Sequence, residues 1–127
     1  MTTVIYAAIA GLMFVGLALR AIGLRKKAMV AIGDGGQPLL RRAIRVHGNF
    51  AEYVPFALVL IWMAEMSTRS NLLTHSLGIL LITGRILHAY GVSQERENLR
   101  FRQIGMVMTF FCIVTASLVL LWTGLPG

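Results

Sequence analysis

Four long apolar runs, separated by short polar segments, make up most of the chain. Residues 1–19 and 104–122 contain no charged residue, and the runs at 50–66 and 72–92 contain few. About 20 mainly apolar residues are enough for a helix to cross the hydrocarbon core of a bilayer. The pattern therefore predicts four membrane-spanning helices. Their expected ranges are about 2–24, 40–66, 72–92 and 101–123.

Composition supports this interpretation, because 57% of the 127 residues are hydrophobic and only 13% are charged. A soluble domain of this size rarely has so apolar a composition. The net charge of +7 does not indicate nucleic-acid binding, since the basic residues form short clusters without interleaved aromatic residues. One cysteine and three unpaired histidines predict no metal site. We expect one all-α domain, residues 1–127, that forms an integral four-helix bundle in the lipid bilayer.

Basic residues are concentrated in the first and third connections between the spans. The second connection contains only Arg69. Basic loops tend to stay on the cytoplasmic side of a membrane. The sequence therefore predicts that both termini lie outside and that connections one and three are cytoplasmic, as in a bacterial inner membrane. The basic residues of connections one and three are Arg25, Lys26, Lys27, Arg41, Arg42, Arg45, Arg96, Arg100 and Arg102.

Polar residues interrupt the second and third spans near this predicted cytoplasmic end. In the second span they are Arg42, Arg45, Asn49 and Glu52. On a helix these four fall within an arc of about 80°, and the third span places Arg85 and His88 one turn apart. An ionised side chain in hydrocarbon costs about 2.5–3.5 kcal/mol on insertion scales, so it normally faces protein or a wet cavity. We expect both groups to share one sheltered pocket.

The side chains available to such a pocket indicate a small anionic ligand. Guanidinium groups bind carboxylates in a two-point fashion, and a glutamate accepts an ammonium group. Tyr53 and Tyr90 add hydroxyl groups. Glutathione, with two carboxylates and one amine, fits this inventory. Residue types alone equally admit a lipid headgroup.

Three motifs resemble those of the membrane-associated proteins in eicosanoid and glutathione metabolism, the MAPEG family, and in particular its short bacterial members. They are AIGDGG, RRAIRVHGNFAEYVPF and GRILHAYG. The resemblance covers nearly the whole chain, and the arginine followed by NxxE is its most specific part. It implies a homotrimer of four-helix subunits that binds glutathione between adjacent subunits near the cytoplasmic side. Members of the family conjugate glutathione to electrophiles, reduce lipid hydroperoxides or isomerise lipid endoperoxides.

The resemblance also assigns roles to individual residues. Arg85 and His88 match an RxxH element, whereas Tyr90 points about 160° away from His88 on an ideal helix, so it would serve a neighbouring subunit or require unwinding at Gly91. The residues assigned to glutathione are Arg42, Arg45, Asn49, Glu52, Tyr53, Arg85, His88, Tyr90 and Arg96. The catalytic arginine that activates the thiol would be Arg96, Arg100 or Arg102, and spacing favours Arg100 or Arg102.

The sequence thus predicts a glutathione transferase or peroxidase that acts on lipophilic electrophiles through an arginine-stabilised thiolate. Glutathione would be the co-substrate, and the electrophile would arrive through the bilayer beside helices one and four. Two alternatives remain open at this stage: a catalytically silent protein that binds lipids or anions, and a small proton-coupled exporter. An exporter would need its carboxylate near the bilayer midplane, and Glu52 is too near the edge. Arg85 could also pair with Glu52 in a purely structural ion pair.

Overall fold

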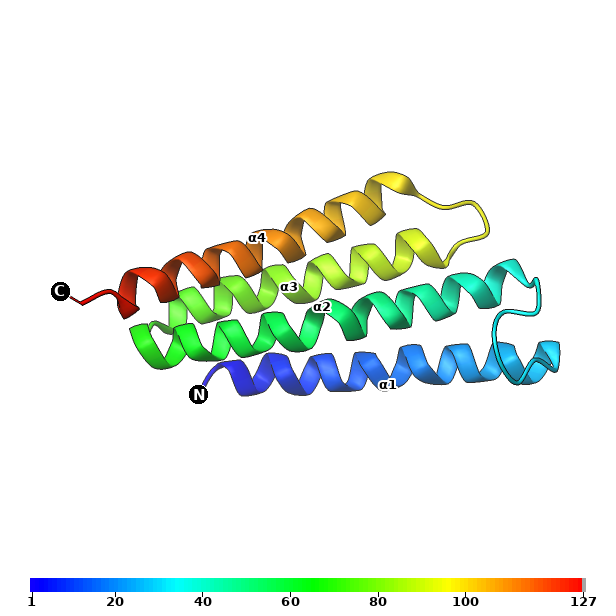
Figure 1. Cartoon of the computed structure of the whole chain (residues 1–127), viewed down its shortest axis with the longest axis horizontal. Coiled ribbons are helices and arrows are strands. Elements are labelled where there is room, and N and C mark those ends of the chain that lie inside the picture. The colour runs from blue at the N-terminus through cyan, green and yellow to red at the C-terminus, as the bar shows by residue number, and fades with distance from the viewer. Residues whose placement is uncertain (127) are drawn as a thin grey trace.

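The computed structural model describes residues 1–126, and the chain forms an antiparallel bundle of long helices (Figure 1). Each helix is long and apolar enough to cross a membrane, and residues 1–126 contain no strand. The predicted all-α fold with four spans is therefore confirmed. The helices are α1 (Thr3–Ala28), α2 (Pro38–Thr68), α3 (Asn71–Ser93) and α4 (Leu99–Gly124).

Local interactions explain where the helices begin and end. Helix α1 continues to Ala28 instead of ending near residue 24, because basic residues in its last turn are compatible with the negative end of the helix dipole. The left-handed conformation of Met29, with φ of 56°, then ends it. Helices α3 and α4 each begin after a capping side chain. Ser70 accepts a hydrogen bond from the N–H of residue 73, and Asn98 accepts one from that of residue 101.

Both termini lie at one end of the bundle, together with the two-residue connection between α2 and α3 (Figure 1). The connections at residues 29–37 and 94–98 lie at the other end, which we call the basic end. This end also carries the start of α2 and the last turn of α1, where Arg25, Lys26 and Lys27 lie. The fold therefore gathers the basic residues that flank the spans at one end of the molecule.

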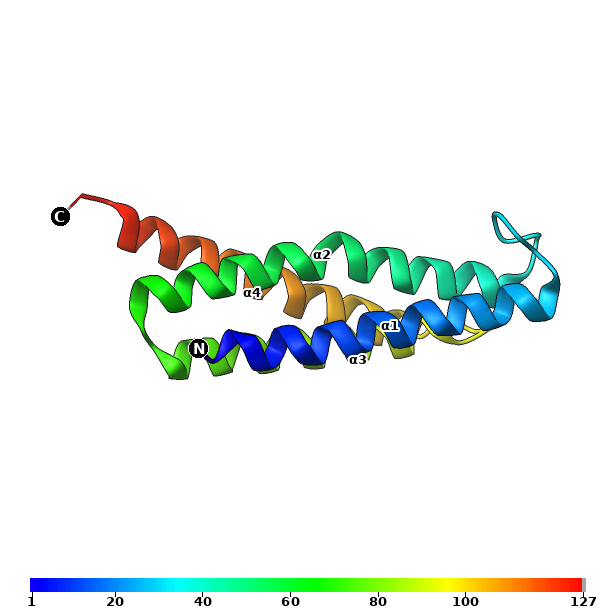
Figure 2. The same cartoon turned by 90° about the horizontal axis from the view of Figure 1, so that it is seen from below.

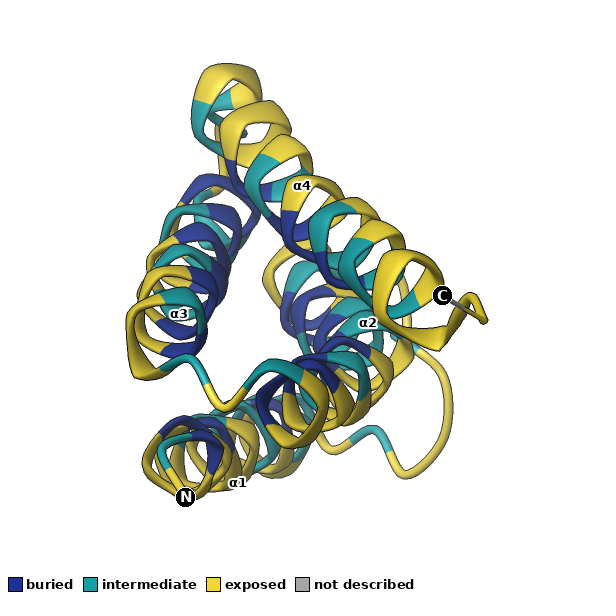
Figure 3. Cartoon of the chain, turned by 90° about the vertical axis from the view of Figure 1, so that its left-hand side faces the viewer, coloured by how far each residue is buried: buried dark blue, intermediate teal, exposed yellow. Residues whose placement is uncertain are grey.

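Helix α1 packs against α2 and α3, and Figure 2 shows it in front of α3. It makes no contact with α4 among the described residues. The buried residues of α2, α3 and α4 lie on the sides of these helices that face one another, whereas most of α1 is exposed (Figure 3). The centre of the core contains Ile61, Leu81 and Cys112, each almost fully buried. A bundle with one loosely covered helix thus surrounds a core built mainly by the other three.

Helices α3 and α4 approach closely at two glycines, one on each helix. A Cβ atom on Gly105 would lie 2.7 Å from the backbone nitrogen of His88, and one on Gly84 would lie 3.1 Å from the carbonyl oxygen of Gly105. Helix backbones can come this near only where side chains are absent. The close approach places the polar residues of α3 directly against α4.

Polar contacts at the two ends of α1 attach it to its neighbours. At the terminal end, Glu65 of α2 is buried and accepts hydrogen bonds from the backbone N–H groups of Thr2 and Thr3, the latter at 2.9 Å, and from the Thr3 hydroxyl. Its carboxylate therefore caps the positive end of the α1 dipole. At the basic end, Arg20 donates to the hydroxyl of Ser93 at 2.8 Å and to its carbonyl oxygen at 3.2 Å. Neither contact was predicted from the sequence.

Candidate functional site

Arg85 is the centre of a buried polar cluster between α2, α3 and α4. Its side chain is only 1% exposed. One guanidinium nitrogen donates to Oδ1 of Asn49 at 2.5 Å and to Nδ1 of His88 at 3.3 Å, so the His88 imidazole accepts there. The other donates to the hydroxyl of Thr109 at 3.4 Å. We call Arg85, Asn49, His88 and Thr109 the buried cluster. Three of its residues were predicted site residues: Asn49 comes from α2, and Arg85 and His88 come from α3.

The positive charge of Arg85 has no carboxylate partner in the described part of the chain. No Asp or Glu oxygen lies within 4.0 Å of its guanidinium, and its Nε atom has no hydrogen-bond partner. The ring of Phe50, with its centroid 5.8 Å from the guanidinium carbon, offers a weak cation–π contact. A structural pair with Glu52, the alternative considered for this arginine, is absent. An uncompensated buried cation of this kind attracts an anion.

A second group of arginines surrounds a hollow of about 260 Å³ at the basic end. Within it, Glu97 accepts a hydrogen bond from Arg102 at 2.6 Å and lies 3.8 Å from Arg42. We call this hollow the arginine pocket. Its lining residues are Pro38, Arg41, Arg42, Arg45, Val92, Glu97 and Arg102.

The arginine pocket and the buried cluster adjoin along α2 and α3. Arg45 and Val92 line the pocket. One helical turn further from the basic end, Asn49 follows Arg45 on α2, and His88 precedes Val92 on α3. Positive charge therefore extends from the surface of the basic end to the interior of the bundle.

The polar stripe of α2 does not face the bundle interior as a whole. The side chains of Arg45 and Glu52 are 56% and 55% exposed and lie 3.5 Å apart, as an ion pair on the outer surface of the bundle. Asn49, between them, turns inward to Arg85. Tyr53 is half-buried, with its ring 5.5 Å from that of Phe110. The structure thus divides the predicted set between the interior and an exposed face.

Three further predicted residues lie outside both groups. Tyr90 is 56% exposed and its ring contacts that of Phe101, 5.6 Å away, on the face of α3 opposite His88. Helix α3 continues to Ser93, so the suggested unwinding at Gly91 is wrong. Arg96 and Arg100 are exposed and form no ion pair within residues 1–126. Of the three candidate thiol activators, Arg102 alone lines the arginine pocket.

Asp34 is a further acidic residue near the arginine pocket, where it pairs with Arg41. The Nε atom of Arg41 donates to its carboxylate at 2.5 Å, and the N–H of Gly36 donates to the same group at 2.9 Å. These two hydrogen bonds hold the pKa of Asp34 below its ordinary value, with the Arg41 contact the larger cause. Arg41 is 61% exposed, so this pair lies in water at the mouth of the pocket.

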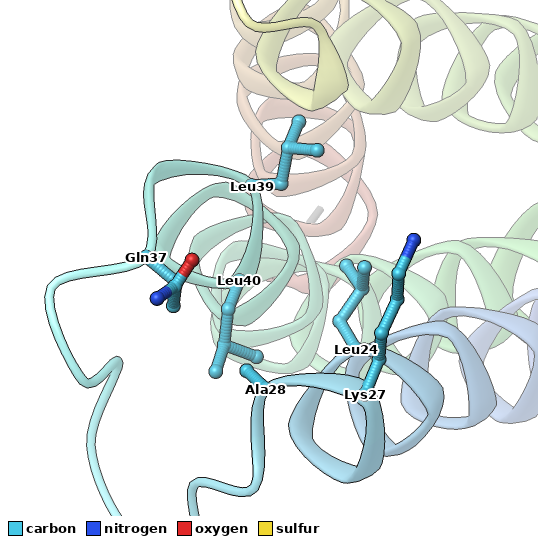
Figure 4. Close-up of a pocket in the computed structure, with 6 residues that line it drawn as sticks. All are labelled: Leu24, Lys27, Ala28, Gln37, Leu39 and Leu40. Atoms are coloured by element: carbon cyan, nitrogen blue, oxygen red, sulfur yellow. The ribbon is translucent and has the colours of Figure 1, made fainter.

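Two other hollows contain none of the predicted site residues. One, of about 360 Å³, lies between the end of α1 and the start of α2 and is lined by Leu24, Lys27, Ala28, Gln37, Leu39 and Leu40 (Figure 4). The other, of about 250 Å³, is almost entirely apolar and lies between α1 and α2 beside Phe14 and Phe50. The second of these hollows is lined by apolar residues, whereas four of the seven residues that line the arginine pocket are arginines.

Two residues of the site, Glu97 and Thr109, were not predicted from the sequence. Glu97 lies directly before the capping residue Asn98 and five residues before an arginine, and this spacing was an available signal. Thr109 was hidden in an apolar run; its hydroxyl donates to the carbonyl of Gly105 and accepts from Arg85. Nothing in the spacing of α4 distinguishes this threonine from packing residues.

Comparisons with known proteins agree with this architecture. A family model described as the MAPEG family matches residues 3–122. The inner membrane protein YecN of Escherichia coli strain K12 is 36% identical over 122 residues, which cover 96% of this chain and 92% of that protein. The inner membrane protein YecN of Escherichia coli O6:H1 gives the same values. The resemblance predicted from the three sequence motifs is confirmed.

Proposed function

The chain belongs to the MAPEG family, and on that premise we propose that it binds glutathione at the arginine pocket and uses the thiol on lipophilic substrates. The expected activities are conjugation of electrophiles and reduction of hydroperoxides. The observation that carries the proposal is the continuity of the arginine pocket with the buried cluster. Glutathione has a carboxylate at each end, and guanidinium groups that could bind them lie both in the arginine pocket and, as Arg85, in the buried cluster.

The buried cluster supports this assignment because it contains a cation that lacks an anion. Arg85 has an unpaired Nε atom and no carboxylate partner among the described residues. Burial of such a charge is costly unless it is paired. A ligand carboxylate near Arg85 would supply the missing partner, and Asn49 and His88 would fix its orientation.

Arg102 is the group we propose to stabilise the glutathione thiolate. It lines the arginine pocket, whereas Arg96 and Arg100 do not. A free cysteine thiol has a pKa of about 8.5 and is only a few per cent ionised at neutral pH. The Arg102 side chain is 50% exposed in the free chain, so the proposal requires the bound ligand to shelter it. One guanidinium in such a sheltered site lowers a thiol pKa by about one to two units, and each unit corresponds to about 1.4 kcal/mol of preferential stabilisation of the anion.

The chemistry then needs no further group from the protein. In conjugation, the thiolate sulfur forms a bond to an electrophilic carbon, the bond to the leaving group breaks, and the thiol proton has already gone to water. In hydroperoxide reduction, two glutathione molecules are oxidised to their disulfide, while the hydroperoxide is reduced to an alcohol and water. The protein binds the tripeptide, keeps the sulfur anionic and admits the apolar substrate from the bilayer.

We also propose that three copies of the chain assemble and complete the site between them. The Arg45–Glu52 pair is exposed on the side of the subunit, within a helix that crosses the bilayer. Charges at such a position are expensive against acyl chains and are normally covered by protein or water. A neighbouring subunit would cover them. By the loop charges, the site would lie near the cytoplasmic face with both termini outside.

The experiment compares Arg102→Ala with Arg100→Ala, two variants that remove the same charge two residues apart. We expect Arg102→Ala to lower turnover of chlorodinitrobenzene by about 10- to 100-fold, because the thiol pKa returns toward its free value. Arg100→Ala should retain nearly full turnover, and calorimetry should detect glutathione binding in both. The ultraviolet absorbance of the thiolate, titrated with pH, checks the cause directly. Unchanged turnover and thiolate titration in Arg102→Ala would refute this role.

A protein that binds lipid headgroups without catalysis is the alternative, because the arginine pocket would also accept a phosphate group. Glutathione and glycerophosphate differ in length and in their end groups. Thermal stabilisation of the purified protein by glutathione but not by glycerophosphate supports the proposal, and the reverse pattern supports the alternative. An exporter is disfavoured, since Glu52 is paired with Arg45 at the subunit surface.

A further inference from the structure

Glu97 is the carboxylate that lines the arginine pocket, and both of its oxygens face arginines. Oε1 accepts from Nη1 of Arg102 at 2.6 Å, and Oε2 lies 3.8 Å from Nη1 of Arg42. Its side chain is only 18% exposed. The two other ion pairs at the pocket, Asp34–Arg41 and Arg45–Glu52, involve arginines that are more than half exposed. Arg102 is 50% exposed and Arg42 is 26% exposed, so the Glu97 pairs are less exposed to solvent than the other two.

The position of Glu97 is fixed by the backbone on both sides of it. The N–H of Asn98 donates to the carbonyl oxygen of Gly91 at 3.0 Å, which turns the connection back onto α3. A Cβ atom on Gly91 would lie 2.8 Å from the carbonyl oxygen of Asn98, so the glycine permits this close approach. Arg42 also donates to the carbonyl oxygen of Val92 at 3.2 Å. The connection holds the Glu97 carboxylate over the arginines instead of leaving it in solvent.

The neighbouring Glu95 shows that charge alone does not produce this arrangement. It lies two residues earlier in the same connection, is exposed, and forms no ion pair within residues 1–126. Arg100, which is closer to Glu97 in sequence than Arg102 is, also forms no ion pair there. The contact is specific to Glu97, Arg102 and Arg42.

We propose that Glu97 is a resident counter-ion, which an anionic ligand must displace from Arg102 and Arg42 before it occupies the arginine pocket. An anion with a single binding group gains about the same interaction free energy with Arg102 and Arg42 as the displaced Glu97 carboxylate loses, so its net binding is weak. An anion that also reaches Arg45 or Arg41 gains additional contacts. Glu97 would thus exclude abundant singly charged anions and admit those with several acidic groups. That the displacing ligand is glutathione rests on the proposed function. The displacement of Glu97 itself requires only that the ligand is an anion.

The test measures binding of inorganic sulfate to the purified full-length protein by calorimetry. Glu97→Gln should lower the dissociation constant about tenfold, because the internal competitor is removed while the size of the side chain is kept. Glu95→Gln, the matched control, should change it less than about twofold, since its charge is solvated. Acetate should compete with sulfate in Glu97→Gln but not in the unmodified protein.

A double-mutant cycle separates displacement from a general charge effect. In an Arg102→Gln background, Glu97→Gln should change the sulfate dissociation constant less than about threefold, because the 2.6 Å contact is gone and only the 3.8 Å contact with Arg42 is left to displace. Glu97→Asp, which keeps the charge on a shorter side chain, should give an intermediate dissociation constant in the original background. An equal gain with and without Arg102 would overturn the inference.

The outcomes also distinguish this inference from the proposed function. Equal sulfate dissociation constants in the unmodified protein and in Glu97→Gln overturn the inference, whatever glutathione does. Tighter sulfate binding in Glu97→Gln together with no detectable glutathione binding upholds the inference and overturns the proposed function. Circular dichroism and thermal unfolding of each variant verify that the helices remain folded.

Discussion

Replacing Arg85 by methionine tests whether the buried cluster exists for stability or for binding. The hydrogen bonds to Asn49, His88 and Thr109 contribute about 1.5–3 kcal/mol each, and the cation–π contact with Phe50 contributes about 0.5–1 kcal/mol. The unpaired Nε atom costs about 1–3 kcal/mol, and desolvation of the guanidinium costs several more. Because these terms nearly cancel, we expect Arg85→Met to change the free energy of unfolding by less than about 2 kcal/mol.

Ligand binding should respond to the same substitution very differently. At a glutathione concentration of 100 times the dissociation constant, the unmodified protein should gain about 2.7 kcal/mol of stability. Glutathione should add almost no stability to Arg85→Met, because the buried guanidinium that would bind its carboxylate is gone. The assay is denaturant unfolding in detergent micelles, with and without glutathione.

Arg20→Met is the matched control, because Arg20 is also a partly sheltered arginine but bonds to Ser93, outside the buried cluster. It should lose about 1–2 kcal/mol of stability and keep the stabilisation by glutathione. A loss above about 4 kcal/mol in Arg85→Met without ligand would show a structural role and refute the reasoning.

Three further predictions concern other parts of the molecule. Glu65→Gln should destabilise the attachment of α1 by about 1–3 kcal/mol, seen as faster hydrogen exchange in its first turns; unchanged exchange would contradict the capping role. Gly105→Ala should cost about 1–3 kcal/mol in unfolding experiments, because its Cβ would lie 2.7 Å from the His88 nitrogen; full stability would mean that α3 and α4 separate easily. Asp34 has a folded-state pKa below its ordinary 3.8, so its pair with Arg41 contributes above about pH 4 and is lost as the pH falls through the lowered value. Hydrogen exchange in residues 29–37 should report that loss, and Asp34→Asn should remove the pH dependence.

Sequence periodicity and composition were sufficient for the helices and for their number. Long apolar runs fix how many spans a chain has, since the bilayer sets the length of each. The helical wheel also grouped Arg45, Asn49 and Glu52 on one arc. It could not determine the direction in which that arc faces, because rotation of a helix about its axis depends on packing against its neighbours. Consequently Asn49 points inward while the other two are exposed.

The contact of Glu97 with Arg42 and that of Arg20 with Ser93 could not be predicted for a different reason. Both depend on where the last turn of α3 lies relative to other helices, and no local pattern encodes that position. Glu97 reaches Arg42 across 55 residues of sequence, and Arg20 reaches Ser93 across 73. Contacts between residues so distant follow from the assembled bundle and from close approaches such as that at Gly91.

The polar contacts at both ends of α1 determine how deeply that helix is seated in the membrane. Between apolar helices in lipid, burial of hydrocarbon gives almost no preference for one vertical alignment over another. Thr3 and Arg20 are 17 residues apart, about 25 Å along a helix, and each is bonded to a different neighbour. A shift of α1 by a single turn would break both contacts at once, so this least enclosed of the four helices has only one allowed alignment.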